Sequence, residues 1–123
     1  MPKNIKSDRT APPTDVASFT VRQLKAEIFQ ALAHPTRIFI VEVLRGKELP
    51  AGTIAELVGV DPSSLSQHLS LLRSRRIIAN RREGNQIFYS VSDKVVFEIL
   101  DAMRRHLQGH LENAMTILKG VRA

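Results

Sequence analysis

The chain has 123 residues, of which 43% are hydrophobic and 24% carry a formal charge. This length suits one domain, and the composition is that of a folded globular protein rather than a disordered chain. The 18 lysines and arginines exceed the 12 acidic residues, which favours a polyanionic partner. Cysteine is absent, which excludes disulfides, thiolate metal sites and thiol redox chemistry.

No apolar stretch approaches the roughly 20 residues that a membrane-spanning helix needs. The first residues also lack the apolar core of a secretory signal. We therefore expect a cytoplasmic protein with no membrane partner. Residues 1–17 hold three of the six prolines together with mixed charge, which predicts a flexible N-terminal arm. Residues 18–119 are expected to form one domain.

Helical spacing of apolar residues begins after the arm. Ser18 or Thr20 is suited to cap the first helix. Pro35 fits the first turn of a second helix over about 35–45. Thr53 can cap a third, short helix. The region before the middle of the chain is therefore predicted to be helical.

Residues 53–75 predict two short helices about a tight turn. Asp61 is a favourable N-cap and Pro62 a favourable first helical residue, so the second of these helices runs from Pro62 to about Arg75. Two short helices joined in this way form a helix-turn-helix. The second helix is the candidate recognition helix, whose N-terminal part would contact base edges.

Residues 77–91 predict a β-hairpin. The segments 77–79 and 87–89 favour strands, and Glu83, Gly84 and Asn85 between them supply turn residues. A hairpin that follows a helix-turn-helix is a wing. The predicted fold is therefore mainly α with a small β-hairpin, a winged helix-turn-helix of about five helices plus a two-stranded wing.

The predicted recognition helix has two different faces. Its leucines share one face, which should pack on the core, while short polar side chains lie opposite. Gln67 can pair bidentately with adenine, and serines can contact base edges or phosphates. His68 lies toward the apolar side, where packing or a phosphate contact is expected. The candidate DNA-binding residues of this helix and the wing are Ser63, Ser64, Ser66, Gln67, His68, Arg73, Arg81, Arg82, Asn85 and Gln86.

A long final helix is predicted over about 93–119. Its apolar residues recur in four-three spacing, which is typical of helix–helix packing. Little core remains for a helix in this position, so we expect it to pair with a second copy of the chain, with help from the first helix. The candidate dimer-interface residues are Leu24, Val96, Leu100, Met103, Leu107 and His110.

Four segments of the sequence stand in a distinctive order and spacing. They are FQALAHPTR at 29–37, TIAEL at 53–57, SSLSQHL at 63–69 and REGNQIFY at 82–89. Together they resemble the ArsR/SmtB family of bacterial and archaeal repressors, over roughly residues 18–115. The resemblance implies a homodimer joined through its first and last helices, operator binding without inducer, and release on sensing a ligand.

The resemblance also concerns metal sensing. Thiolate sensors of the family carry a motif like Glu-Leu-Cys-Val-Cys, where this chain reads ELVGV at 56–60, so that type of sensing is lost. The family's zinc- or nickel-type site between paired last helices would keep Asp93 and His106, whereas a valine and a glycine replace its other two ligands. His110 shares a helix face with His106 and could complete a weak zinc or nickel site, although it also lies on the packing face.

Enzyme motifs such as a phosphate-binding glycine loop, G-x-S-x-G or H-E-x-x-H do not occur, so no enzymatic activity is expected. The favoured interpretation is a sequence-specific regulator of transcription that binds double-stranded operator DNA, a dimeric repressor released by an effector that the sequence does not identify. Three alternatives stay open. These are a metal-responsive repressor using Asp93, His106 and His110, a winged-helix protein-interaction module, and an RNA-binding module.

Overall fold

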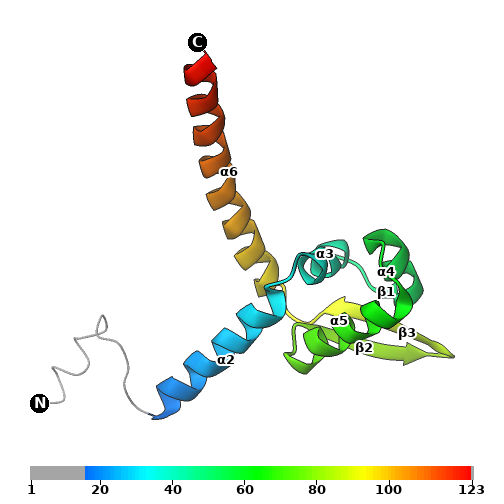
Figure 1. The fold of residues 1–123 in the computed structure, drawn as a ribbon. Helices are drawn as coiled ribbons and strands as arrows, with labels where there is room; N and C mark the ends of the chain where they lie inside the picture. The colour runs from blue at the N-terminus through cyan, green and yellow to red at the C-terminus, as the bar shows by residue number, and fades with distance from the viewer. Residues whose placement is uncertain (1–15, 123) are drawn as a thin grey trace, which may run out of the picture.

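The computed structural model describes residues 16–122 (Figure 1). The elements along this part are α2 (Val16–Leu32), α3 (Pro35–Val43), β1 (Leu49–Pro50), α4 (Ala51–Val58), α5 (Pro62–Ser74), β2 (Ile78–Glu83), β3 (Gln86–Val91) and α6 (Val95–Arg122). The mainly helical fold with a small sheet is as predicted. None of the described helices is both long and apolar enough to cross a membrane. The predicted arm lies outside the described residues, except that Val16 and Ala17 belong to α2.

The predictions for the starts of the first two described helices have different outcomes. The predicted cap at Ser18 or Thr20 is wrong, because α2 already includes both residues and the Thr20 hydroxyl donates to the carbonyl oxygen of Val16 (3.1 Å). The start of α3 at its proline is confirmed. His34 is its N-cap residue, and the Nδ1 atom of His34 accepts a hydrogen bond from the backbone N–H of Thr36 (3.1 Å). This bond satisfies one of the N–H groups that a helix start leaves without a partner.

Helices α4 and α5 form the predicted helix-turn-helix. The prediction that Thr53 caps α4 is wrong, because α4 begins at Ala51, directly after the extended residue Pro50. The turn between the two helices begins at Gly59, whose φ of 78° is left-handed and suits glycine. The predicted N-cap of α5 is confirmed, since the Asp61 side chain accepts a hydrogen bond from the N–H of Ser64.

The predicted hairpin is confirmed, and a third strand joins it. Glu83 pairs with Gln86, so that Gly84 and Asn85 form a two-residue turn in which Gly84 has a φ of 63°. Strand β1 pairs with β3 and gives the antiparallel order β1-β3-β2. The predicted two-stranded wing is therefore present, and β1 is an additional strand that was not predicted, because a two-residue strand containing a proline has no recognisable sequence pattern.

The core lies between α3, α4, α5 and the start of the sheet. Leu65, Leu69 and Leu72 anchor α5 in it, as predicted. Full burial of one such side chain stabilises the fold by roughly 1.5–3 kcal/mol, so this leucine row fixes which face of α5 points outward. The buried hydrophobic residues are Ala31, Leu32, Ile40, Val41, Leu44, Ile54, Leu65, Leu69, Leu72, Ile77, Ile78 and Val96.

Helix α6 contacts the core only through its first turns. Val96 is 7% exposed and belongs to the core cluster, and Phe97 and Leu100 are partly buried against it. The prediction of Val96 as a dimer-interface residue is therefore wrong, because the first turn of α6 covers part of the core of its own chain. Beyond these turns α6 extends away from the body, as does α2 in another direction (Figure 1).

Candidate nucleic-acid interface

The outward face of α5 carries short polar side chains. Ser63, Gln67, Ser70 and Ser74 are exposed on the side away from the buried leucines. Gln67 makes no hydrogen bond to another residue of the described part, so its amide can donate and accept at the same time toward an external group. This is the pattern of donors and acceptors that adenine presents in the major groove.

The N-terminal end of α5 is held by the carboxylate of Asp61. This carboxylate accepts hydrogen bonds from the Ser63 hydroxyl (2.7 Å) and from the N–H of Ser64 (3.1 Å). These bonds, with the one from Ser63 the strongest, keep the pKa of Asp61 well below its usual range. Because the hydroxyl proton of Ser63 points to Asp61, the Ser63 oxygen is directed to accept from an external donor. Ser64 is half-buried and Ser66 is exposed on the flank of the helix.

The two wing arginines have different surroundings. Opposite residues of an antiparallel pair share a face, and Arg81 stands opposite Phe88 whereas Arg82 stands opposite Ile87. The Arg81 guanidinium bonds both carboxylate oxygens of Glu48 at 2.8 Å, pairs with Glu83, and lies 4.9 Å from the centre of the Phe88 ring. Its hydrogen bonds lower the pKa of Glu48. The structure thus gives Arg81 two intramolecular acidic partners.

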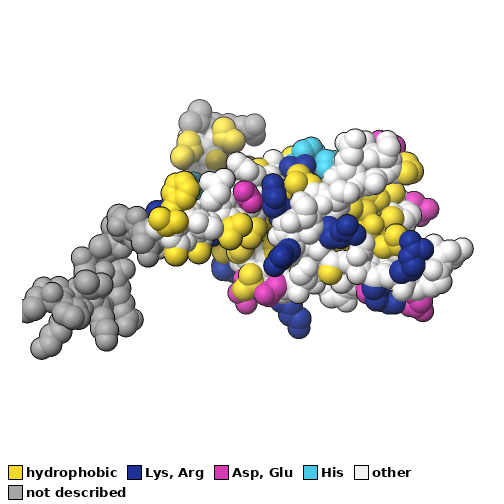
Figure 2. Space-filling model, turned by 90° about the horizontal axis from the view of Figure 1, so that it is seen from below, with side chains coloured by type: hydrophobic (Ala, Val, Ile, Leu, Met, Phe, Trp, Pro, Cys, Tyr) yellow, Lys and Arg dark blue, Asp and Glu magenta, His cyan; other side chains and the backbone are white. Residues whose placement is uncertain are grey.

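Arg82 lies on the other face of β2, is exposed and forms no ion pair with a described residue. Asn85 and Gln86 are exposed at the hairpin turn, and Arg73 is exposed at the last turn of α5. Figure 2 shows Lys and Arg side chains spread over the body of the molecule. Arg73, Arg82, Asn85 and Gln86 are therefore all accessible at the end of α5 and in the wing.

His68 differs from the other candidates on α5. Its ring is half-buried, 4.8 Å from the ring of His34, and its Nδ1 atom lies 3.4 Å from a guanidinium nitrogen of Arg37. The prediction that His68 lies toward the apolar side is confirmed. Arg37 was missed as a candidate, because 31 residues separate it from His68 and only the fold brings the two side chains together.

Both helices that project from the body expose apolar side chains. On α2 these are Val16, Phe19, Val21, Leu24, Ile28 and Phe29. On α6 they are Val95, Met103, Leu107, Leu111, Met115, Ile117 and Leu118. Figure 2 shows the apolar side chains gathered along α2. Exposed apolar side chains gathered along a helix in this way indicate an interaction with another macromolecule.

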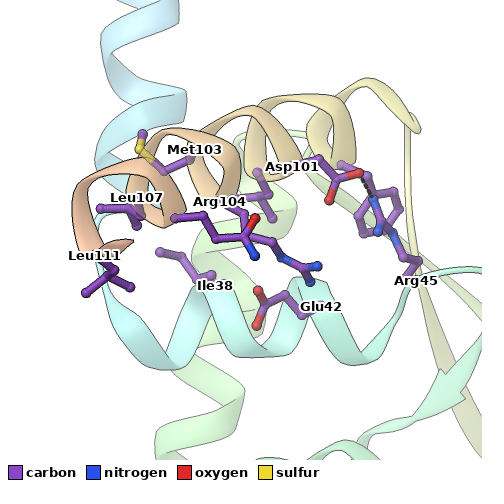
Figure 3. Close-up of a pocket in the computed structure, with 11 residues that line it drawn as sticks. Ile38, Glu42, Arg45, Asp101, Met103, Arg104, Leu107 and Leu111 are labelled. Carbon is purple, nitrogen blue, oxygen red and sulfur yellow. Dashed lines mark hydrogen bonds and ion pairs between the residues drawn. The ribbon is translucent and has the colours of Figure 1, made fainter. Parts of the chain in front are cut away.

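A groove of about 580 Å³ lies between α3 and α6 (Figure 3). Ile38 forms its α3 side, and Met103, Leu107 and Leu111 line it from α6. At the end near the body, the Arg45–Asp101 ion pair (2.6 Å) joins α6 to the turn that follows α3. Of the predicted dimer residues, Leu24, Met103, Leu107 and His110 are therefore exposed, whereas Leu100 is half-buried and Val96 buried.

Comparisons with known proteins agree with this geometry. A family model described as a helix-turn-helix domain matches residues 32–80. The HTH-type transcriptional regulator Rv0081 of Mycobacterium tuberculosis is 38% identical over 102 residues, which cover 82% of this chain and 90% of that protein. The transcriptional repressor SmtB homologue of Synechocystis is 35% identical over 94 residues, 76% of this chain and 71% of that protein. This chain belongs to the ArsR/SmtB family of transcriptional regulators.

Solved structures place this ArsR/SmtB member in the same fold. The crystal structure of M. tuberculosis Rv0081 has a TM-score of 0.70 at 38% identity and covers 77% of this chain and 96% of that one. The homodimeric winged helix-turn-helix domain of Mb0332 from Mycobacterium bovis has a TM-score of 0.74, covering 84% and 95% of the two chains, and at 23% identity this likeness concerns the fold. The protein is a DNA-binding transcriptional regulator, and its family is not an enzyme family.

The candidate metal ligands of this ArsR/SmtB chain lie on or beside α6. The Asp93 carboxylate accepts a hydrogen bond from the N–H of Val95 (3.0 Å) at the start of the helix. His106 and His110 are exposed, with ring centres 4.4 Å apart. Within the described residues, no three His, Cys, Asp or Glu side chains come together as a metal site. Of the three candidate ligands, the described part of the chain therefore brings only His106 and His110 together.

We predict that zinc or nickel binds no more tightly than about micromolar, because tight zinc sites need three or four protein ligands. Calorimetric titration of the metal-free protein measures this affinity. The same titration on His106→Ala shows whether the weak binding uses the His106–His110 pair. Stoichiometric nanomolar binding that His106→Ala abolishes would contradict the prediction and favour a metal-responsive repressor.

Proposed function

We propose that this protein is a homodimeric repressor that binds a specific double-stranded operator with α5 in the major groove and releases it when an effector binds. The observation that carries the proposal is the polar face of α5. Ser63 and Gln67 are exposed at its N-terminal part, while Leu65 and Leu69 fix the helix from behind. A helix with exposed short polar residues and no lysine or glutamate is suited to close contact with base edges.

In this proposal the wing and the end of α5 hold the DNA backbone. Arg82 and Arg73 are exposed and without ion partners in the described part, so both can contact phosphates. Arg81 contributes in another way, since its pair with Glu48 joins the wing to the residue before β1, while its pair with Glu83 lies within β2. Contacts of this kind orient the protein on the duplex and carry no sequence information of their own.

The exposed apolar faces of α2 and α6 support a homodimer. An exposed apolar surface formed by residues such as Leu24 and Leu107 is unfavourable in water and becomes buried when two copies associate. A two-fold dimer would carry two α5 helices and so bind two half-sites. The regulator would act in the cytoplasm, where its operator is located.

The salt dependence of binding tests whether the wing contacts the DNA backbone. Each lost phosphate contact should reduce the slope of log affinity against log salt by about 0.9. We expect this reduction for Arg82→Ala on operator and random duplex alike. Arg81→Ala is the matched control and should change the slope less, because its charge is already balanced by Glu48 and Glu83.

Fluorescence anisotropy over a range of salt concentrations measures both slopes. An unchanged slope for Arg82→Ala would mean that the wing does not contact the DNA backbone. Tighter binding of single-stranded RNA than of any duplex would contradict the proposed function as a whole. So would tight binding to duplex DNA without any preference between sequences, which is the behaviour of a non-specific basic surface.

A further inference from the structure

Arg37 occupies the junction between α2 and the recognition helix. Its Nε atom donates to the carbonyl oxygen of Ala31 (2.5 Å) and a terminal nitrogen donates to that of Gln30 (3.4 Å). Both carbonyls belong to the last turn of α2, where the helix dipole is negative, and the Gln30 oxygen also accepts from the N–H of Ala33 (3.2 Å). Arg37, which lies on α3, therefore caps the C-terminal end of α2.

The other terminal nitrogen of Arg37 faces the recognition helix, 3.4 Å from Nδ1 of His68. A guanidinium nitrogen can only donate, so this contact requires that Nδ1 of His68 carries no proton. His34 is constrained in the same way, because its own Nδ1 accepts from the N–H of Thr36. The two imidazoles thus lie in contact, with ring centres 4.8 Å apart, and each presents an acceptor nitrogen to a different neighbour.

We propose that Arg37 is a positioning residue that fixes the recognition helix α5 against the end of α2 through His68, and that this contact holds only while His68 is neutral. The inference rests on the proposed function, because it concerns how α5 is placed for specific DNA binding. Since α2 also carries an exposed apolar face, the contact links the surface proposed for dimerisation to the surface proposed for base recognition.

The charges around His68 support this dependence on its protonation. The groups that face it are His34, from the turn between α2 and α3, and Arg37, from α3. Glu27 of α2 is instead paired with Arg75 after the end of α5 (3.7 Å). Burial, followed by the two neighbouring basic groups, lowers the pKa of His68.

The sign of the pH effect follows from this lowered pKa. The unfolded chain takes up a proton on this histidine at a higher pH than the folded chain does, so the contact stabilises the fold fully above the ordinary histidine value of about 6.5. Its contribution is lost as the pH falls below that value. A proton on His68 would then place a second cation beside Arg37 and remove the acceptor.

The test compares an operator duplex, selected from random sequences by the protein itself, with a scrambled duplex of equal length. Fluorescence anisotropy at constant ionic strength measures the affinity for both. We expect the preference for operator to fall about tenfold between pH of about 7.5 and about 5.5, the effect of losing one charge-assisted hydrogen bond. Binding of the scrambled duplex should not fall, because phosphate contacts depend on positive charge rather than on the position of α5.

Three variants test whether this pH response comes from His68 and its contact with Arg37. His68→Asn keeps an acceptor near the Nδ1 position without titrating, so its preference should be the same at both pH values. His34→Asn is the matched control, since asparagine retains the N-cap bond to Thr36 and His68 still titrates, and it should keep the pH response. Arg37→Lys should lower the preference already at the higher pH, because an ammonium cannot replace the planar fork toward three acceptors.

A pH response in His68→Asn equal to that of the unmodified protein would overturn the proposal, as would an unchanged operator preference in Arg37→Lys. Circular dichroism at each pH verifies that every variant is folded. A preference for operator that does not change with pH would contradict this inference alone. Absence of any operator preference at either pH would contradict the proposed function itself.

Discussion

Replacement of Leu107 by glutamate should convert the proposed dimer into monomers and weaken operator binding by about 10²–10⁴-fold, the loss expected when two linked half-sites become independent. The Leu107 side chain is 51% exposed in the protomer and lies on the apolar face of α6. The substitution therefore leaves the core intact, but it places carboxylates in the interface, where burial of charge is costly. Sedimentation velocity measures the oligomeric state.

Leu57→Glu is the matched control for this prediction. Leu57 is 50% exposed, nearly the same as Leu107, but it lies on α4 in the body of the molecule. This variant should remain dimeric. Leu100→Glu is a less clean test, because Leu100 packs partly against the core and its replacement also destabilises the fold. A dimeric Leu107→Glu variant would place the interface elsewhere on the surface.

Replacement of Gln67 by alanine should remove the preference for one base pair in each half-site, at a cost of about 1–3 kcal/mol in discrimination. The amide of Gln67 is exposed and makes no hydrogen bond within the described residues, so the change does not disturb the fold. Anisotropy on the operator and on duplexes substituted at single positions measures the effect. Binding to random DNA should stay the same.

Ser74→Ala provides the control on the same face of α5. Its hydroxyl donates to the carbonyl oxygen of Leu71 (2.7 Å) at the far end of the helix, away from the N-terminal part that enters the groove. This variant should keep the full sequence preference. Equal loss of affinity on operator and random DNA by Gln67→Ala would exclude a role in base recognition and assign Gln67 to backbone contact.

Local chemistry made much of the fold predictable. Asp61 and Pro62 mark the start of the recognition helix by side-chain capping and a fixed φ, and both effects act within a few residues. The wing turn was predictable from an equally local effect, because Gly84 readily adopts the positive φ that the turn requires. Strand β1 was not predictable, because two residues contain no periodicity. Val96 was assigned to the wrong surface, because the spacing of apolar residues shows that a face is buried but not what covers it.

The candidate site was predictable only in part, for a related reason. The polar face of α5 follows from the spacing of Ser63 and Gln67 along one helix. The partners of Arg81 and Arg37 do not, since Glu48 is 33 residues from Arg81 and His68 is 31 residues from Arg37. Tertiary contacts decide whether an arginine pairs with an acidic residue or remains exposed. They pair Arg81 with Glu48 and leave Arg82 exposed.

Selection of random duplexes with the purified protein tests the central claim most directly. A two-fold dimer with one recognition helix in each half should enrich an inverted repeat, with half-site centres about 10–10.5 base pairs, or a multiple of that distance, apart. The Gln67→Ala protein should enrich the same repeat with one position relaxed in each half. Failure to enrich any sequence, or enrichment of a single site without two-fold symmetry, would contradict the account of this protein as a dimeric, sequence-specific repressor.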